Sequence, residues 1–116
     1  MTLILDADAL IKLNRIGALD LVASNSECII PGAVYQEAVA DARVAGYLDS
    51  DAIDLVVRRH IRVETTSDLE QVGVPNHFGA GEKQVLALAM RDPQESVVVS
   101  DDQVFVNLVR QLEVRF

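Results

Sequence analysis

The chain begins with Leu3-Ile4-Leu5-Asp6-Ala7-Asp8, and the same pattern returns near its end as Val97-Val98-Val99-Ser100-Asp101-Asp102. In both stretches a short, wholly apolar run is followed closely by acidic residues. Continuous apolar runs are typical of strands that are covered on both faces, in the interior of a parallel sheet. We therefore predict two interior strands with carboxylates at their carboxyl ends. If the two strands are neighbours, these carboxylates converge.

Three further strands are predicted along the chain. Cys28–Ile30 is another continuous apolar run and is expected in the sheet interior. Ile61–Glu64 and Glu113–Phe116 alternate apolar with polar residues, which is typical of half-solvated strands at the rims of a sheet. Residues 65–79 carry turn-forming residues with little periodicity and are expected to form the one long loop.

Helical stretches are predicted between these strands, at about 8–16, 18–24, 33–45, 50–59, 80–91 and 102–111. Helices that alternate with strands predict an α/β fold, in which helices cover a mostly parallel sheet of five strands. Such sheets bind ligands beyond the carboxyl ends of their strands. The acidic residues at those ends are therefore the first candidates for a functional site.

Length and composition narrow the expected class of protein. The chain has 116 residues and a mass of 12.7 kDa, so a single domain spanning residues 1–116 is expected. Half of the residues are apolar, which is too many for a disordered chain. No apolar run approaches the roughly 20 residues that span a bilayer, and the first residues lack a signal peptide. We expect a cytoplasmic protein with no membrane segment, and the single cysteine, Cys28, suits a reducing compartment.

The charge balance argues against one kind of partner surface. The chain carries 10 Lys and Arg against 18 Asp and Glu, for a net charge of -8. A broad basic face that captures nucleic acid or anionic membrane is therefore not expected. The positions of the carboxylates are more informative than their number.

Acidic residues interrupt the apolar pattern at four places: after the first strand, after the strand at 97–99, and on two helices. Glu82 stands three residues before Val85, on the apolar stripe of its helix, where a solvated helix would not carry a carboxylate. Glu37 is placed less clearly, because an apolar face that includes Ala38 and Val39 competes with it. All four places lie toward one side of the predicted sheet, which favours a joint role.

Each of these acids also has an ordinary structural explanation. Asp6 or Asp8 can cap the helix that follows the first strand. Glu82 suits the positive end of a helix dipole, and the acidic pair after the strand at 97–99 can cap the next helix. Glu37 can be a solvated helix residue. These alternatives stay open for each residue taken alone.

Crowded carboxylates call for a cation. Two carboxylates about 4 Å apart repel by roughly 4 kcal/mol at an effective dielectric constant near 20. Oxygen donors without cysteine or a histidine pair favour Mg²⁺ or Mn²⁺ over zinc. Such an ion keeps open positions that can bind a phosphate oxygen and orient water. The set of acids therefore predicts chemistry on a phosphodiester or a phosphomonoester.

Five separated segments, in order and spacing over nearly the whole chain, carry a family resemblance. They are Ile4–Ile11, Arg15–Leu21, Ile30–Glu37, Gly79–Ala89 and Val99–Asp102. Together they resemble the successive motifs of PIN-domain proteins, and more narrowly those of small prokaryotic PIN proteins related to VapC-type toxins. The resemblance implies a three-layer sandwich with a central parallel sheet of order 3-2-1-4-5, which makes the first and fourth strands neighbours.

The resemblance also implies a Mg²⁺- or Mn²⁺-dependent endoribonuclease that acts on single-stranded or loop RNA. Carried across residue by residue, its catalytic acids are Asp6, Glu37, Glu82 and Asp102. The metal ligands are Asp6, Glu82 and Asp102, with Asp101 the rival for the last place. Ser100 would orient that acid, and Asp8 occupies a supporting position.

The candidates for substrate contact come from the few basic residues of the sequence, and the partners come from the resemblance. Lys12 and Arg15 lie one and two turns beyond Asp8 and are the candidates for RNA contact, although an Asp8–Lys12 pair at i,i+4 spacing explains Lys12 equally well. A homodimer and an antitoxin that covers the acidic groove are implied by the family. Two departures stand out: residues 103–106 are largely apolar where close relatives are basic, and the chain ends at Phe116, where the family often adds a helix.

Two other functions remain open from the sequence. Leu5-Asp6-Ala7-Asp8 also resembles the signature of haloacid-dehalogenase-type phosphatases, in which the first aspartate is a covalent nucleophile. Against that class, neither Thr nor Val stands two residues after Asp8. The second alternative is a PIN-like module that binds RNA or protein without cutting it, which the low surface basicity favours.

Overall fold

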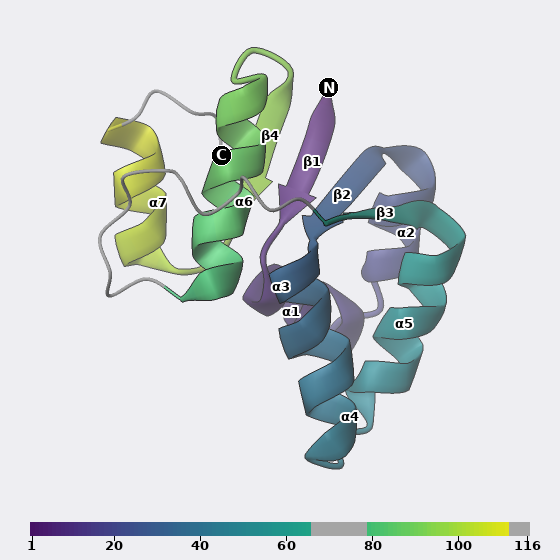
Figure 1. The fold of residues 1–116 in the computed structure, drawn as a ribbon. Helices are drawn as coiled ribbons and strands as arrows, with labels where there is room; N and C mark the ends of the chain where they lie inside the picture. The colour runs from purple at the N-terminus through teal and green to yellow at the C-terminus, as the bar shows by residue number, and fades with distance from the viewer. Residues whose placement is uncertain (66–78, 112–116) are drawn as a thin grey trace.

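Four parallel strands form one sheet in the order β3-β2-β1-β4 in the computed structural model, which describes residues 1–65 and 79–111 (Figure 1). The strands are β1 Thr2–Leu5, β2 Glu27–Pro31, β3 Ile61–Glu64 and β4 Ser96–Val99. The predicted order of the first four strands is confirmed, with β3 at a rim and β1 beside β4. The fifth predicted strand, Glu113–Phe116, and nearly all of the predicted loop lie outside the described residues.

The helices lie where hydrophobic periodicity predicts them. They are α1 Ala7–Arg15, α2 Leu19–Asn25, α5 Asp49–His60, α6 Ala80–Arg91 and α7 Gln103–Gln111. The predicted helix at 33–45 is a continuous helical run of three parts: α3 Gly32–Tyr35, a π-helical segment η1 Gln36–Asp41, and α4 Ala42–Val44. The π-helical segment was not predicted, and it bears on the position of Glu37.

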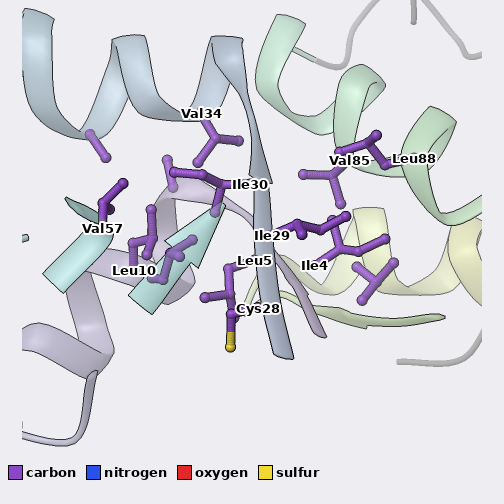
Figure 2. Packing of buried hydrophobic residues seen from close by; sticks show 14 of the residues in the cluster. Ile4, Leu5, Leu10, Cys28, Ile29, Ile30, Val34, Val57, Val85 and Leu88 are labelled. Atoms are coloured by element: carbon purple, nitrogen blue, oxygen red, sulfur yellow. The ribbon is translucent and has the colours of Figure 1, made fainter. Parts of the chain in front are cut away.

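The sheet is buried on both faces because helices cover each face. Successive side chains along a strand point to opposite faces and pack against these two helical layers. Ile4 and Ile29 are register partners on one face, where they lie with Val85 and Leu88 of α6 (Figure 2). On the next positions along the strands, side chains such as Leu5 point to the opposite face, toward α1. Full burial of an Ile or Leu side chain stabilises the fold by about 1.5–3 kcal/mol. The predicted three-layer α/β sandwich is thereby confirmed.

The pairing of β1 with β4 positions the acidic residues. Leu5 is the register partner of Val99, and the backbone N–H of Asp6 donates to the carbonyl oxygen of Val99 at 3.2 Å. Asp6 and Ser100 therefore leave the sheet at the same level. Within the described part of the chain, the helices are too short or too polar to cross a membrane.

Candidate active site

Asp6 is a buried carboxylate at the junction of β1 and α1, with a relative exposure of 4%. Its Oδ1 accepts a hydrogen bond from the backbone N–H of Ala9 at 2.8 Å, so the predicted N-cap role is confirmed. The hydroxyl of Ser100 hydrogen-bonds to the same carboxyl group. Burial nevertheless raises the pKa of Asp6, with smaller contributions from the charges of Asp8 and Asp102. A carboxylate has about four acceptor positions, so these two bonds leave room for a ligand.

Ser100 connects two of the predicted acids. Its Oγ accepts the backbone N–H of Asp102 at 3.2 Å, while its hydroxyl group hydrogen-bonds to Asp6. The family resemblance implies that Ser100 orients the acid that follows it. In the structure one hydroxyl holds the backbone at Asp102 and the side chain of Asp6, so it fixes the two strand ends relative to each other.

Asp101 and Asp102 take different directions. The carboxylate of Asp101 forms an ion pair with Lys12, and both side chains are more than half exposed. The charge of Asp102, by contrast, raises the pKa of both Asp6 and Glu82. Of the two acids that the sequence leaves open, Asp102 is the one whose charge acts on Asp6 and Glu82.

Glu82 is a half-buried carboxyl group in the first turn of α6. Burial, followed by the charges of Asp102 and Asp6, raises its pKa from 4.5 to about 7. Among the described residues, Glu82 Oε2 is the one buried side-chain oxygen or nitrogen without a hydrogen-bond partner. A buried acceptor left unpaired costs about 1–3 kcal/mol. This oxygen therefore points to a bound group that satisfies it.

Glu37 reaches the site from the π-helical segment. Such segments carry an extra residue per turn and are frequent at functional sites. Burial and the charges of Asp8 and Asp6 raise the pKa of Glu37. A Cβ atom on Gly81 would lie 3.4 Å from Glu37 Oε2 and 3.3 Å from Val34 Cγ2. The absence of a side chain at Gly81 allows α6 to approach Glu37 closely.

Four carboxylates surround a small hollow at this end of the sheet. The hollow has a volume of about 30 Å³ and is lined by Asp6, Ala7, Asp8, Glu37, Gly81 and Glu82. That volume holds about one water molecule or one ion. Within residues 1–65 and 79–111, no three Asp, Glu, His or Cys side chains stand close enough to ligate one ion directly.

The donor set fits a hydrated Mg²⁺ or Mn²⁺ ion. Mg²⁺ usually keeps several waters and takes only one or two carboxylates directly. The hollow offers carboxylate oxygens together with the unpartnered Oε2 of Glu82. Asp6 and Glu82 would hold such an ion, with Glu37 contributing charge from the wall of the hollow and Asp102 contributing charge from beyond its lining.

The two candidates for RNA contact are engaged in surface ion pairs. Lys12 pairs with Asp101 rather than with Asp8, so the alternative Asp8–Lys12 pair is not the one formed. Arg15 Nε donates to Asp49 Oδ2 at 3.1 Å. Exposed pairs of this kind contribute about 0–1 kcal/mol, so a phosphate group can compete for either cation.

Three residues that shape the site were not predicted. Gly81 belongs to one of the family-like segments, but the sequence does not indicate that it allows α6 to approach Glu37. Gln84 Oε1 accepts the backbone N–H of Ala33 at 3.0 Å and ties α6 to α3 across 51 residues of sequence. Asp54, buried on α5, accepts hydrogen bonds from Tyr35, Arg43 and Arg58 and anchors the helical run that carries Glu37. No local pattern in the sequence signals either long-range contact.

Comparisons with known proteins give one family. A protein-family model described as a PIN domain matches residues 2–116, which includes the whole sheet and every acid of the hollow. A search of curated proteins finds no match to the chain.

Proposed function

Because this chain belongs to the PIN-domain family, a family of nuclease-type fold, we propose that it is a Mg²⁺- or Mn²⁺-dependent endoribonuclease acting on single-stranded or loop RNA. The observation that carries this proposal is the unpartnered, buried Oε2 of Glu82 beside Asp6 in a hollow lined by carboxylates. Ionised carboxylates this close together repel one another, and a bound cation offsets that repulsion.

The chain's own carboxylates supply the rigid oxygen ligands that would hold the ion. Asp6 is held rigidly, since its carboxylate also caps α1 and bonds to Ser100. Glu82, whose pKa is about 7 in the absence of a cation, would give up its proton when it holds the ion. A divalent ion, when bound, stabilises the negative charge that develops on the phosphoryl group. Lys12 would hold a neighbouring phosphate after exchange from Asp101, and Arg15 would contact the RNA while it stays paired with Asp49.

The family match bears on the phosphatase alternative. It covers nearly the whole chain, whereas the phosphatase resemblance rests on one tetrapeptide at residues 5–8. A PIN-like module without catalysis remains the second candidate function, and the net charge of -8 favours it.

A toxin role and two protein partners form a further part of the proposal. An antitoxin would cover the acidic hollow, and its cationic side chain would complement carboxylates that otherwise repel one another. A homodimer is also expected. Both partners are implied by the family resemblance alone.

The direct test is cleavage of a panel of structured RNAs by purified protein stripped with EDTA and then supplied with Mn²⁺. The wild type should cut exposed loops, and Asp6→Asn should reduce the rate by more than about 100-fold. Asp20→Asn, on the exposed face of α2, is the matched control and should cut normally. Intact RNA that is nevertheless bound would support the non-catalytic module, and an aspartyl phosphate trapped by a fluoride analogue would support the phosphatase.

A further inference from the structure

A larger cleft lies beside the acidic hollow and shares Glu37 with it. Its volume is about 440 Å³, within the range of small-ligand sites in proteins. Helix α1 connects the two places, because Asp8 lines the hollow while Ile11 and Arg15 line the cleft at helical spacing. A ligand in the cleft would therefore lie next to a group bound in the hollow.

The lining of the cleft is apolar at its base and polar at its edge. The apolar part comes from Ile11, Ala38, Ala42 and Ile53, of which Ile53 is fully buried. The polar edge comes from Arg15, Asp41, Tyr47 and Asp49. This combination suits a flat aromatic ligand whose faces are apolar and whose edges form hydrogen bonds.

Tyr47 is an exposed ring on a fixed backbone. Gly46 has a φ of +83° and ends the helical run, with its N–H bonded to Arg43 O at 3.1 Å and the N–H of Tyr47 bonded to Ala42 O at 2.9 Å. This pair of bonds is a Schellman motif. The carbonyl oxygen of Tyr47 also accepts the hydroxyl of Ser50 at 2.9 Å. Tyr47 nevertheless keeps a relative exposure of 66% and lines the cleft, so its side chain is accessible to a ligand there.

Asp49 gives the edge of the cleft a preference among bases. Its carboxylate follows Tyr47 by two residues and is held by Arg15. Each carboxylate oxygen accepts two hydrogen bonds, so the group can bind Arg15 and a ligand together. Guanine presents adjacent N1–H and N2–H donors that match the two oxygens of one carboxylate. Adenine, cytosine and uracil place an acceptor beside each donor on that edge, and a carboxylate repels the acceptor.

We propose that this cleft is a guanine subsite, which takes the base of the nucleotide next to the phosphate that an ion in the acidic hollow would hold. Tyr47 stacks on the base, Asp49 accepts its N1–H and N2–H, and Arg15 positions Asp49. The proposal rests on the proposed function, because the base belongs to the RNA substrate. The subsite determines which loop residue is presented to the acids.

The test measures binding of the four nucleoside 5′-monophosphates in EDTA, by NMR shift titration of the whole chain. Guanosine monophosphate should bind roughly tenfold more tightly than the other three. Tyr47→Ala should weaken its binding roughly tenfold, and Tyr47→Phe should keep it. Asp49→Asn should remove the preference for guanine, while Asp41→Asn, on the same cleft, should preserve it.

Substitution of Val44 and Leu48 distinguishes a nucleotide subsite from a protein-binding surface. Both flank the cleft in sequence and are more than nine-tenths exposed. The double variant Val44→Ser, Leu48→Ser should bind guanosine monophosphate normally. Loss of binding in that variant, equal binding of all four nucleotides, or no binding by natively folded protein would each overturn the subsite.

The same titration tests the subsite independently of the nuclease proposal, because it requires neither a metal ion nor cleavage. Binding of guanosine monophosphate by a protein that never cuts RNA would reject the nuclease function and keep the subsite. Cleavage of RNA without preference for a loop guanine, by protein that binds no nucleotide, would reject the subsite alone.

Discussion

Lys12 of α1 and Asp101, in the connection between β4 and α7, form an ion pair at the carboxyl end of the sheet. Two consecutive acids therefore have different roles. Asp101 pairs with a surface cation, whereas the charge of Asp102 acts on Asp6 and Glu82. Adjacent residues of the same type thus have different surroundings. Their substitution should have different consequences.

Asp101→Asn should leave the rise in melting temperature caused by Mn²⁺ unchanged, whereas Asp102→Asn should lower it. Asp101→Asn should also strengthen RNA binding by roughly two- to fivefold, since Lys12 loses a competing partner worth about 0–1 kcal/mol. Thermal melts with and without Mn²⁺ and filter binding of a labelled loop RNA measure the two effects. A loss of the Mn²⁺ response in Asp101→Asn would instead make Asp101 a metal ligand.

Substitutions of Asp6 should separate its cap from its charge. Asp6→Asn keeps an oxygen that can accept the Ala9 N–H, so the metal-free protein should melt within a few degrees of the wild type while the Mn²⁺ response is lost. Asp6→Ala loses the cap as well, at about 1 kcal/mol. That cost corresponds to a fall of roughly 4 °C relative to Asp6→Asn in a domain of this size. Equal melting temperatures for the two variants would argue against the cap.

The stability of the metal-free protein should decrease as pH rises from 4.5 to about 7. In this window the folded state holds a proton on Glu82, whose pKa is about 7, more tightly than the unfolded state does. The folded state binds more protons, so unfolding becomes easier as pH increases. Melting temperatures in EDTA across this range test the slope, which Glu82→Gln should flatten. An unchanged slope in Glu82→Gln would assign the effect to another group.

Binding of Mn²⁺ should have the opposite pH dependence. The ion competes with the proton on Glu82, so its affinity should rise by up to about tenfold per pH unit below pH 7 and level off above it. Isothermal titration of Mn²⁺ at several pH values measures this. A flat affinity between about pH 5.5 and 7 would show that the ion binds without Glu82.

Gly81→Ala should lower activity more than stability. Replacing a helical glycine by alanine gains about 1 kcal/mol in helix propensity. The new Cβ, however, would lie 3.3 Å from Val34 Cγ2, which is a tight contact, and 3.4 Å from Glu37 Oε2, at the edge of ordinary contact. We expect RNA cleavage to fall roughly tenfold with a change in stability below about 1 kcal/mol.

Gly79→Ala is the matched control for Gly81, because a Cβ there meets no atom within 4 Å and the backbone φ is -70°. It should cleave RNA at the normal rate. Equal losses in the two variants would mean that the start of α6, rather than its approach to Glu37, is what activity requires.

The positions of the elements could be predicted closely from local pattern. The apolar runs at β1, β2 and β4 and the alternation at β3 each appear in the structure within one or two residues. Glu82 was singled out because a carboxylate on an apolar stripe is anomalous, and the structure gives it the raised pKa that this anomaly suggests. Apolar runs, alternation and a misplaced carboxylate are each visible within a few consecutive residues, because they reflect only which side chains are buried.

Glu37 shows where local pattern fails. A regular helix of 3.6 residues per turn gives it a competing apolar face, whereas the π-helical segment Gln36–Asp41 changes the phase of the helix and turns Glu37 to the hollow. Tyr35 and Arg43, which lie on either side of this segment, both donate to Asp54 on α5, which is distant in sequence. Periodicity cannot report such a contact.

The amino-acid order by itself determined the strands, the helices and the placement of acids at strand and helix ends, because local burial and hydrogen bonding leave a period in the sequence. Only the folded chain decided that the charge of Asp102 acts on Asp6 and Glu82 while Asp101 pairs with Lys12, and that Glu82 keeps an unpartnered oxygen. These outcomes depend on distances between segments as far apart as β1 and α6. Electrostatic interaction and desolvation are set by such distances, which no single segment encodes.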